Sequence, residues 1–454
     1  MTAFGWDAKG VCEALGLGAA SWDHAYRGFS TDTRTVRDGD LFVALKGERY
    51  DAHDYLSDVR LAGGSAVVVR RGTPRWPGFD WFEVDDTLAA LGRLARHRRD
   101  AFAGPVVAVT GTNGKTSTRA LIAAALGARF VVHQSERNLN NLVGVPLTVL
   151  AAPLEAQAMV AECGASLRGE LPRMREIVRP DVAVVTNVGA GHLEGFGGLE
   201  QALEEKVALL GGVATAVVGV QPPALAEAAR RTAQRVITAG LDAPADWTAE
   251  PVAVGAAGRP RFTVRGVEVE LPLCGRHMVG NALIALAVAD VLGVPVAEAA
   301  PALRAARIPG GRSELVEIEG ITIIDDSYNA NPASLRAALD LLASVRGGRR
   351  AVVVVGTMRE LGAASAELHR EAAEAVLAAR PDLIAAVGEF VPAFEALHGR
   401  IKAKKLLLGS TPEAVAEPLK QRLQRGDVVL FKASRGVALE RLFPLLWPTH
   451  TRAP

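Results

Sequence analysis

The sequence is poor in the residue types that mark several classes of protein. Only 5% of its 454 residues are aromatic, and its three cysteines are scattered without the spacing of a metal site or a disulfide framework. The formal net charge of +1 gives no reason to expect nucleic acid or an acidic membrane surface as a partner. No apolar run is long enough to span a bilayer, and the N-terminus lacks a charged segment followed by an apolar core. We therefore expect a cytoplasmic protein that neither binds nucleic acid nor inserts into a membrane.

Apolar residues are abundant, at 49% of the chain, and most of them are aliphatic. This composition is typical of an α/β protein, and the length indicates roughly two to four domains. Nearly continuous apolar runs alternate with helical stretches, which predicts parallel sheets covered on both faces. The predicted strands lie at 158–162, 181–186 and 214–220, and in a second unit at 321–324, 351–355, 383–387 and 427–431. Turn residues at 102–105 and 307–312 mark boundaries, and residues 242–270 look like a β-rich insertion.

The segment from Gly104 to Ser117 is the most informative part of the chain. An apolar strand run leads into a glycine-rich turn and then into a helical pattern over 118–126. Backbone amides at a helix N-terminus, together with the helix dipole, form an anion site. Lys115 would add a charge for the outer phosphates, and the Thr116 hydroxyl could bind magnesium. The segment predicts nucleoside triphosphate binding, although Val109 stands where the Walker A pattern has glycine; a ligand-free glycine-rich turn is the alternative.

Other polar residues leave two interpretations open. Glu162 ends an apolar strand and could be a magnesium ligand or a buried structural glutamate. His192 follows another strand end, where a structural histidine is the commoner case, and Lys206 falls on an amphipathic helix, where a solvated lysine is the ordinary interpretation. The segment 325–332 places two carboxylates, a tyrosine and two asparagines directly after a strand, which indicates either a ligand site or a turn rich in side-chain hydrogen bonds.

Over nearly its whole length the chain resembles the Mur ligases, which are ATP-dependent amide-forming enzymes of peptidoglycan precursor synthesis. Their phosphate loop, Gly-Thr-x-Gly-Lys-Thr, is matched by Gly111 to Thr116, which accounts for the missing Walker glycine. Within the family, several stretches resemble most the members that join D-alanyl-D-alanine to UDP-N-acetylmuramoyl-tripeptide. These stretches are 30–35, 39–47, 138–146, 192–197, 326–332 and 356–362 with Ser365 and His369.

The resemblance implies a fold, an activity and partners. The fold would be α/β with three domains: an N-terminal α/β UDP-sugar-binding domain over 1–102, a central ATP-binding domain with a P-loop ATPase-type parallel sheet over 103–311, and a C-terminal Rossmann-like domain over 312–454. The activity would be ATP-dependent ligation through an acyl phosphate. The partners would be UDP-N-acetylmuramoyl-tripeptide and D-alanyl-D-alanine, and the protein would be a monomer.

The resemblance also implies roles for individual residues. Thr116 and Glu162 would hold one of two magnesium ions, and His192 and Lys206 would hold the second. Lys206 would be carbamylated, because an ammonium group repels a metal ion whereas a carbamate presents oxygen ligands to it. Lys115, Lys206 and His192 would be catalytic. The nucleotide would contact Gly111, Thr112, Asn113, Gly114, Lys115, Thr116, Ser117, Asn281, Arg312, Asp326 and Tyr328. The organic substrates would contact Ser30, Thr31, Asp32, Arg34, Asn138, Asn140, Asn141, Asn329, Asn331, Lys432 and Arg435.

Some positions depart from the family pattern, and other functions remain open. Met278 stands for an asparagine, Gly191 for the alanine before the histidine, and Ala433 for a glycine near the C-terminus. The first alternative is another Mur-type ligase or a folylpolyglutamate synthase. The second is a nucleotide-regulated binding protein without ligase activity, which would not need His192 and Lys206 for a second metal.

Overall fold

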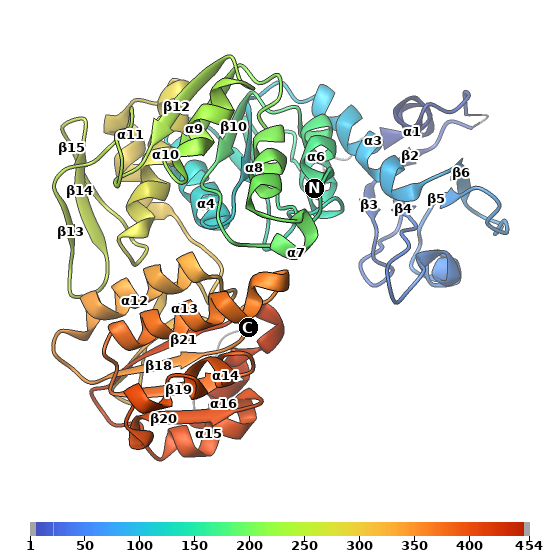
Figure 1. The fold of residues 1–454 in the computed structure, drawn as a ribbon. Helices are drawn as coiled ribbons and strands as arrows, with labels where there is room; N and C mark the ends of the chain where they lie inside the picture. The colour runs from blue at the N-terminus through green and yellow to red at the C-terminus, as the bar shows by residue number, and fades with distance from the viewer. Residues whose placement is uncertain (1–5, 21, 449–454) are drawn as a thin grey trace. The chain divides into compact units, whose positions relative to one another are not determined.

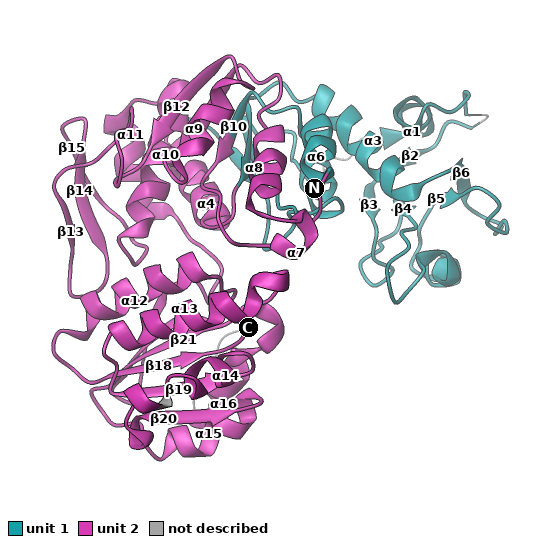
Figure 2. Cartoon of the chain, viewed as in Figure 1, with its two compact units in different colours: residues 1–110, 129–165, 169–183 teal, residues 111–128, 166–168, 184–454 magenta. Residues whose placement is uncertain are grey.

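The computed structural model describes residues 6–20 and 22–448, and the chain forms two compact units (Figure 1, Figure 2). Unit 1 comprises residues 1–110, 129–165 and 169–183, and unit 2 comprises 111–128, 166–168 and 184–454. The boundary passes through strand β10 (Val182–Val185). Each unit is described by itself.

Unit 1 begins with a small parallel sheet. Its strands β3 (Gly28–Ser30), β4 (Asp40–Val43), β5 (Ala66–Arg70) and β6 (Asp80–Val84) are hydrogen-bonded in that order. Phe42, Val67 and Trp81 belong to the buried cluster on this sheet. The remaining elements here are β1 (Trp6–Asp7), α1 (Ala8–Leu15), β2 (Ala25–Tyr26) and α2 (Leu56–Leu61). Apolar residues on strands and helices thus give this region its own core.

The rest of unit 1 contains a second set of parallel strands, β8 (Val132–Gln134), β9 (Ala158–Glu162) and β7 (Val106–Thr110), in the order β8-β9-β7. Every residue of β7 and β9 is buried, as expected for central strands of a parallel sheet. The helices are α3 (Thr87–Asp100), α5 (Gly144–Leu150) and α6 (Glu170–Val178), and α3 packs against both of the others. Asp86 caps α3 by accepting from the N–H groups of Leu88 and Ala89. In the register of β7 with β9, Val109 lies opposite Glu162, so both strands end at the same edge.

Unit 2 contains the helix that follows the phosphate loop. This helix, α4 (Lys115–Leu126), packs along α10 (His277–Val291). Strands β11 (Thr215–Gly219) and β12 (Arg235–Ala239) are parallel, and β13 (Val252–Val254), β14 (Pro260–Val264) and β15 (Val267–Glu270) form an antiparallel sheet. The β-rich insertion predicted at 242–270 is therefore confirmed. The other helices before residue 310 are α7 (Leu193–Phe196), α8 (Leu199–Ala208), α9 (Pro223–Arg230) and α11 (Val296–Ala302).

The C-terminal part of unit 2 is built on a six-stranded sheet in the order β16-β17-β21-β18-β19-β20, parallel except for β16. The strands are β16 (Glu314–Ile318), β17 (Ile321–Asp326), β18 (Ala351–Val355), β19 (Leu383–Val387), β20 (Leu406–Gly409) and β21 (Val428–Lys432). The helices are α12 (Pro332–Arg346), α13 (Ser365–Ala378), α14 (Phe390–Glu395), α15 (Pro412–Lys420) and α16 (Leu442–Leu446). One core includes buried residues of α12 to α14 and the other those of α15 and α16, so helices cover both faces (Figure 1).

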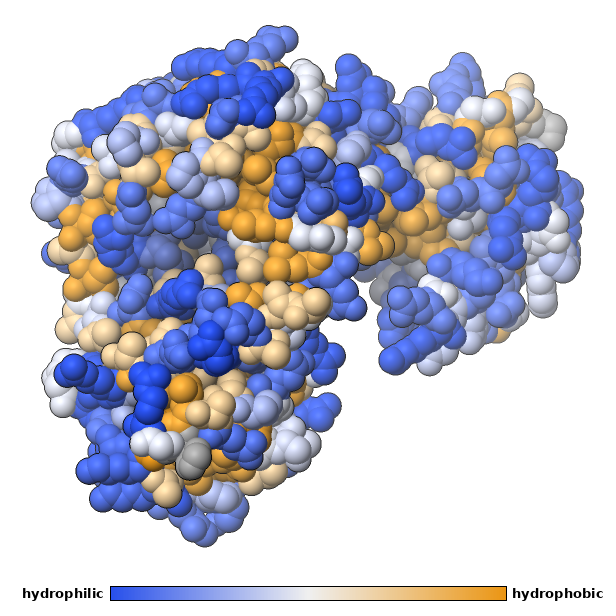
Figure 3. All heavy atoms as spheres, viewed as in Figure 1, coloured by the Kyte–Doolittle hydropathy of each residue, from blue (hydrophilic) through white to orange (hydrophobic). Residues whose placement is uncertain are grey.

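The predicted α/β class with parallel sheets is confirmed, and the helix after the phosphate loop begins earlier than predicted. It starts at Lys115 and not at residue 118, because Gly114 adopts the left-handed conformation that lets the chain enter the helix at once. The limits 102/103 and 311/312 remain a prediction. None of the helices within 6–20 and 22–448 has the length and apolarity needed to cross a bilayer. Hydrophilic residues are interspersed with hydrophobic ones on the visible face of both units (Figure 3).

Two glycines in unit 2 predict opposite effects on stability. Gly280 lies inside α10, where an added β-carbon would have no neighbour within 4 Å, so Gly280→Ala should raise the free energy of unfolding by about 0.5–1 kcal/mol. A β-carbon on Gly219 would lie 1.9 Å from the carbonyl oxygen of Thr186, so Gly219→Ala should lower the free energy of unfolding by about 1–3 kcal/mol. Urea unfolding of the two variants beside the unmodified protein measures both changes. Equal stability of the two variants would contradict the packing described here.

Candidate active site

The phosphate loop joins β7 to α4 through two glycines that no other residue could replace. A β-carbon on Gly111 would lie 1.9 Å from Thr186 Oγ1, and one on Gly114 would lie 2.6 Å from Asn281 Oδ1. Both glycines also have positive φ, at 145° and 78°. The N-cap residue of α4 is Gly114, which has no side chain to bind the first N–H groups, and the positive end of the helix dipole faces the loop. The arrangement fits an anion held by backbone groups.

The loop is fastened to the segment that follows β10. Asn187 accepts from the N–H of Thr112 through its carbonyl oxygen and from the N–H of Asn113 through Oδ1, both at 2.9 Å. Thr186 Oγ1 donates to the carbonyl oxygen of Asn113 at 2.6 Å. These bonds fix the loop before a ligand arrives. The sequence pattern alone assigns Asn187 no role, although this residue opens the glycine-rich stretch just before His192.

Two lysines approach the loop. Lys115 Nζ donates to the carbonyl oxygens of Gly111 at 2.9 Å and Thr112 at 3.2 Å. Lys206 on α8 is only 1% exposed, and its Nζ lies 4.9 Å from the centre of the Phe196 ring. Burial, and then the charge of Lys115, lower the pKa of Lys206 to about 7. The interpretation of Lys206 as a solvated surface lysine is therefore wrong.

His192 sits between two polar partners. Its Nδ1 lies 2.5 Å from Glu360 Oε2 and 3.3 Å from Ser166 Oγ. The hydrogen bond from His192 lowers the pKa of Glu360. The N–H of Glu194 donates to the carbonyl oxygen of Glu360 at 3.3 Å, so backbone and side chain together dock the loop after β18 on α7. A carboxylate that binds one imidazole nitrogen orients the ring and leaves Nε2 for another ligand. The sequence pattern points to neither Glu360 nor Ser166 individually, although 356–362 is one of the family-like stretches.

The carboxyl ends of β17 and β21 bring several predicted residues together. Asp326 lies opposite Lys432 in the register, and their side chains form a buried ion pair at 2.7 Å. Lys432 Nζ also donates to the carbonyl oxygen of Asn329 at 2.6 Å, and Asp326 Oδ1 accepts from the N–H of Ser313 at 2.9 Å. Ligands of open α/β sheets bind at such strand ends.

The turn after β17 has features of both interpretations given to it. Asp325 Oδ1 accepts from the N–H and the hydroxyl of Ser327, which is an Asx-type turn. The same segment reaches the phosphate loop, because the amides of Asn331 and Asn113 bind each other through two hydrogen bonds, at 2.7 and 3.2 Å. Asn331 also caps α12 by accepting from the N–H of Ser334. The segment is thus both a structured turn and part of the site.

Tyr328 lies against two arginines. The guanidinium of Arg312 is 3.8 Å from the centre of its ring, and that of Arg435 is 6.0 Å away. Arg435 also pairs with Glu440 at 2.8 Å. Arg312 therefore covers one face of the ring that was predicted to contact the nucleotide. The contacts of Arg312 and Tyr328 with a nucleotide, and of Arg435 with the organic substrates, remain predictions.

Asn281 lies beside the loop on α10. It is 7% exposed, and its Nδ2 donates to Met278 Sδ at 3.6 Å. Thr116 and Ser117 are buried at the start of α4, at 2% and 5% exposure. Within unit 2 the structure therefore gathers the phosphate loop, Asn281 and the residues of the 325–332 segment.

Glu162, in unit 1, is held in a polar cluster of its own. Asn140 Nδ2 donates to Glu162 Oε1 at 2.9 Å, and the backbone N–H of Glu162 donates to Ser135 Oγ at 3.0 Å. Asn141 Oδ1 accepts from the N–H groups that start α5, at Val143 and Gly144, and Asn138 is exposed. The asparagine stretch and Glu162 thus lie together, and two of the three asparagines orient local structure.

The predicted sugar-site residues of unit 1 form a compact turn. Ser30 Oγ donates to the carbonyl oxygen of Asp32 at 2.9 Å and accepts from its N–H. Asp32 binds the Arg34 guanidinium through both carboxylate oxygens, and this hydrogen bonding lowers the pKa of Asp32. Arg34 is exposed and Thr31 is half-buried. The contact of this turn with a UDP-sugar remains a prediction.

Within 6–20 and 22–448 no three His, Cys, Asp or Glu side chains converge as metal ligands. The predicted magnesium ligands do not form such a group, because two of the four, Thr116 and Lys206, are neither His, Cys, Asp nor Glu. Hydroxyl and carboxylate oxygens are ligands that magnesium accepts.

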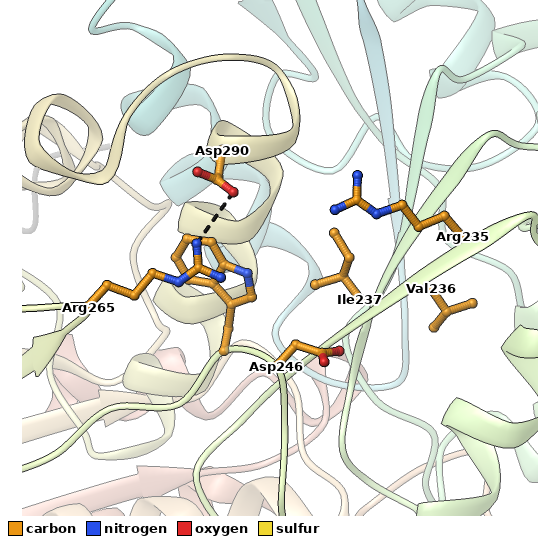
Figure 4. Close-up of a pocket in the computed structure, with 7 residues that line it drawn as sticks. Arg235, Val236, Ile237, Asp246, Arg265 and Asp290 are labelled. Carbon is orange, nitrogen blue, oxygen red and sulfur yellow. Dashed lines mark ion pairs between the residues drawn. The ribbon is translucent and has the colours of Figure 1, made fainter.

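A separate cavity of about 340 Å³ lies near β12 and contains none of the predicted site residues (Figure 4). Arg265 lies 3.7 Å over the Trp247 ring and 3.5 Å from Asp290 Oδ2. Arg265 occupies the β14–β15 turn with a φ of 47°, so these contacts offset a strained backbone and hold the hairpin to α10.

Comparison with known proteins gives consistent matches. A family model described as the Mur ligase middle domain matches residues 109–289, and one described as "Mur ligase, glutamate ligase domain" matches 311–435. The chain is 34% identical over 426 residues to UDP-N-acetylmuramoyl-tripeptide--D-alanyl-D-alanine ligase of Bacillus subtilis (strain 168), covering 91% of this chain and 92% of that protein. It is similar to a crystal structure of MurF from Acinetobacter baumannii, with a TM-score of 0.89, 30% identity and coverage of 98% and 99%. It is also similar to the MurF ligase from Thermotoga maritima in complex with ADP, with a TM-score of 0.81, 31% identity and coverage of 92% and 97%.

The lowered pKa of Lys206 predicts a pH-dependent stability difference. The unfolded chain holds this proton up to its ordinary pKa near 10.5, whereas the folded protein loses it near 7, so stability from this group is lost as pH falls through that window. Lys206→Met should therefore stabilise the protein most near pH 7, with a difference that shrinks as pH rises to 10, by at most about 1.4 kcal/mol per pH unit.

Urea unfolding of both proteins in carbon-dioxide-free buffer with a chelator measures this difference. Lys420→Met removes an exposed lysine and controls for the change in net charge. A stability difference for Lys206→Met that is constant from pH 7 to 10 would contradict the prediction.

Proposed function

The chain belongs to the Mur ligase family, and we propose that it joins D-alanyl-D-alanine to UDP-N-acetylmuramoyl-tripeptide with hydrolysis of ATP, in peptidoglycan precursor synthesis. The observation that carries the proposal is the docking of the 325–332 segment on the phosphate loop, through the Asn113–Asn331 amide pair. That segment is the stretch most specific to the D-alanyl-D-alanine-adding members. Likeness over more than nine-tenths of the chain supports the same substrates.

The chemistry follows from the need for a leaving group. A carboxylate does not expel oxide, so the γ-phosphoryl group of ATP passes to the terminal carboxylate of the tripeptide, and ADP leaves. The amine of D-alanyl-D-alanine then attacks the acyl phosphate, and phosphate leaves as the amide forms. Two anions approach in the first step, and Lys115, at the positive end of α4, lowers their repulsion.

The metal sites remain part of the proposal. Thr116 and Glu162 would hold one magnesium ion, and His192 with a carbamylated Lys206 the second. Their donor chemistry fits, because Glu162 is a buried carboxylate and Glu360 orients the His192 ring. Magnesium would supply positive charge to the phosphates. Lys206 fits carbamylation, because the neutral amine that reacts with carbon dioxide is abundant when the pKa is about 7.

The remaining roles are assigned to the two units separately. Ser30, Thr31, Asp32 and Arg34 of unit 1 would meet the UDP-sugar, and the 138–141 asparagines the organic substrate. In unit 2, Asn281, Arg312, Asp326 and Tyr328 would contact the nucleotide. Asn329, Asn331, Lys432 and Arg435 would contact the substrates. The protein would act as a cytoplasmic monomer.

Two alternatives are tested with the same protein. A sister ligase on this fold would use a single amino acid as the amine, and a nucleotide-regulated binding protein would not consume ATP in response to the organic substrates. Burial of Lys206 near Lys115 disfavours the second alternative, because such a protein has no need of a second metal site at the loop.

Carbamylation predicts a signal that depends on one side chain. In ¹³C-bicarbonate, the protein should show a carbamate resonance in its ¹³C spectrum that Lys206→Ala lacks, because the buried amine has a pKa of about 7. Lys420→Ala, which removes an exposed lysine, should retain the resonance and serves as the control. A spectrum identical for all three proteins would exclude the modification.

The ligase assignment predicts that phosphate release from ATP requires both organic substrates together. Mass spectrometry should then detect UDP-N-acetylmuramoyl-pentapeptide, and Lys206→Ala should lower kcat by about 100-fold or more. Turnover with a single amino acid in place of D-alanyl-D-alanine would instead identify a sister ligase. No release with any acceptor would leave the binding protein.

A further inference from the structure

A pair of side-chain amides connects the phosphate loop with the start of α12. Asn113 Nδ2 donates to Asn331 Oδ1 at 3.2 Å, and Asn331 Nδ2 donates to Asn113 Oδ1 at 2.7 Å, although the two residues are 218 positions apart. Asn331 is 8% exposed. Two amides that exchange both hydrogen bonds lie in one relative orientation, so the contact has directional specificity.

Both members of the pair are fixed on their own side of the contact. The backbone N–H and carbonyl oxygen of Asn113 bind Asn187 Oδ1 and Thr186 Oγ1, at 2.9 and 2.6 Å. The Oδ1 of Asn331 accepts from the N–H of Ser334, and its backbone N–H donates to Ser334 Oγ in a capping box. The side chains therefore project from rigid backbone, and little conformational entropy is lost when they pair.

Neither local structure needs an amide. An N-cap requires only an acceptor, which serine or aspartate supplies as well as asparagine, so the Nδ2 donor of Asn331 is surplus to the cap. Within the described part of the chain, the Asn113 side-chain amide makes both of its hydrogen bonds with Asn331. The two amide groups thus serve the contact between the segments.

The segment held by this contact also takes part in a charged network of the C-terminal sheet. Asn331 lies two residues after Asn329, whose carbonyl oxygen accepts from Lys432, and Lys432 pairs with Asp326. Moving α12 away from the loop would move this network with it, because β17 and β21 share one sheet register.

We propose that Asn113 and Asn331 are positioning residues that hold the Asp326–Lys432 network at the phosphate loop, and so couple nucleotide affinity to the placement of the C-terminal sheet. The phosphate loop and α12 stabilise each other's position. A nucleotide on the loop can contact residues of the C-terminal sheet only while the Asn113–Asn331 pair is formed. The inference rests on the nucleotide-binding part of the proposed function. It does not depend on which amide the enzyme makes.

A double-mutant cycle on the full chain tests the coupling. ADP with magnesium is titrated calorimetrically into the unmodified protein, Asn113→Ser, Asn331→Ser and the double variant. Serine preserves the N-cap of α12, and removing the pair should raise the Kd for ADP by about fivefold to tenfold in each single variant. The double variant should bind no more than about twofold weaker than either single variant, because all three lose the same contact.

Ser334→Ala is the matched control, because it breaks the capping box and leaves the amide pair in place. It should lower the melting temperature by as much as Asn331→Ser or more, yet change the Kd for ADP by less than about twofold. Three results would each overturn the inference: unchanged affinity in the single variants, fold-changes that multiply in the double variant, or equal loss of affinity in Ser334→Ala.

These titrations use no organic substrate, so their failure differs from failure of the ligase assignment. A chain that binds ADP with the expected coupling but makes no amide would keep this inference and lose the ligase. An active ligase without the coupling would do the reverse.

Discussion

The burial of the Lys206 amine near Lys115 is the constraint on which the rest of the site depends. Burial disfavours the charged form of Lys206, and the neighbouring ammonium disfavours it further, which brings its pKa to about 7. Lys115 is held by carbonyl oxygens of the loop, and Lys206 faces the ring of Phe196. Negative charge stabilises two neighbouring lysines, whether it lies between the two amines or is carried by one of the side chains. A triphosphate would supply that charge to Lys115, and a carbamate would place it on Lys206.

The fold presents polar groups where strands end. In the C-terminal sheet, Asp326 and Lys432 close neighbouring parallel strands, and β18 on the other side of β21 leads into the loop with Glu360. Each strand is apolar along its buried length and becomes polar at its end. Because parallel strands end at one edge, three distant segments reach one place without any of them leaving its own hydrophobic core.

Local pattern was sufficient to predict buried strands such as β9, β18 and β21, the phosphate loop and the polar turn after β17. Each is encoded within a few consecutive residues: apolar runs for strands, glycines for positive φ, and asparagine or aspartate for turns. Local pattern could not predict the burial of Lys206, since a lysine on an amphipathic helix is ordinarily solvated and only packing around α8 excludes water from this one. Local pattern also could not predict the pairs Asn113–Asn331 and His192–Glu360, because pairing between residues so far apart in the sequence depends on tertiary structure. The start of α4 was missed because helical pattern is weak in its first turn, where the loop glycine decides the boundary.

Two departures from the family pattern have a physical account in the structure. A β-carbon on Gly191 would lie 2.8 Å from Thr112 Cγ2, and Thr112 cannot move away, because its hydroxyl donates to the carbonyl oxygen of Gly189 and accepts from the Gly189 N–H. Glycine at 191 is thus the residue that lets this tight loop-to-loop contact form beside the Asn113–Asn331 pair. Met278 serves as the hydrogen-bond acceptor for Asn281, and its thioether is a weaker acceptor than an amide oxygen. Asn281 nevertheless packs directly against Gly114. A β-carbon on residue 114 would lie 2.6 Å from Asn281 Oδ1, so only glycine at this position leaves room for the Asn281 side chain. The two departures therefore adjust how the phosphate loop is packed and leave its hydrogen-bonded frame in place.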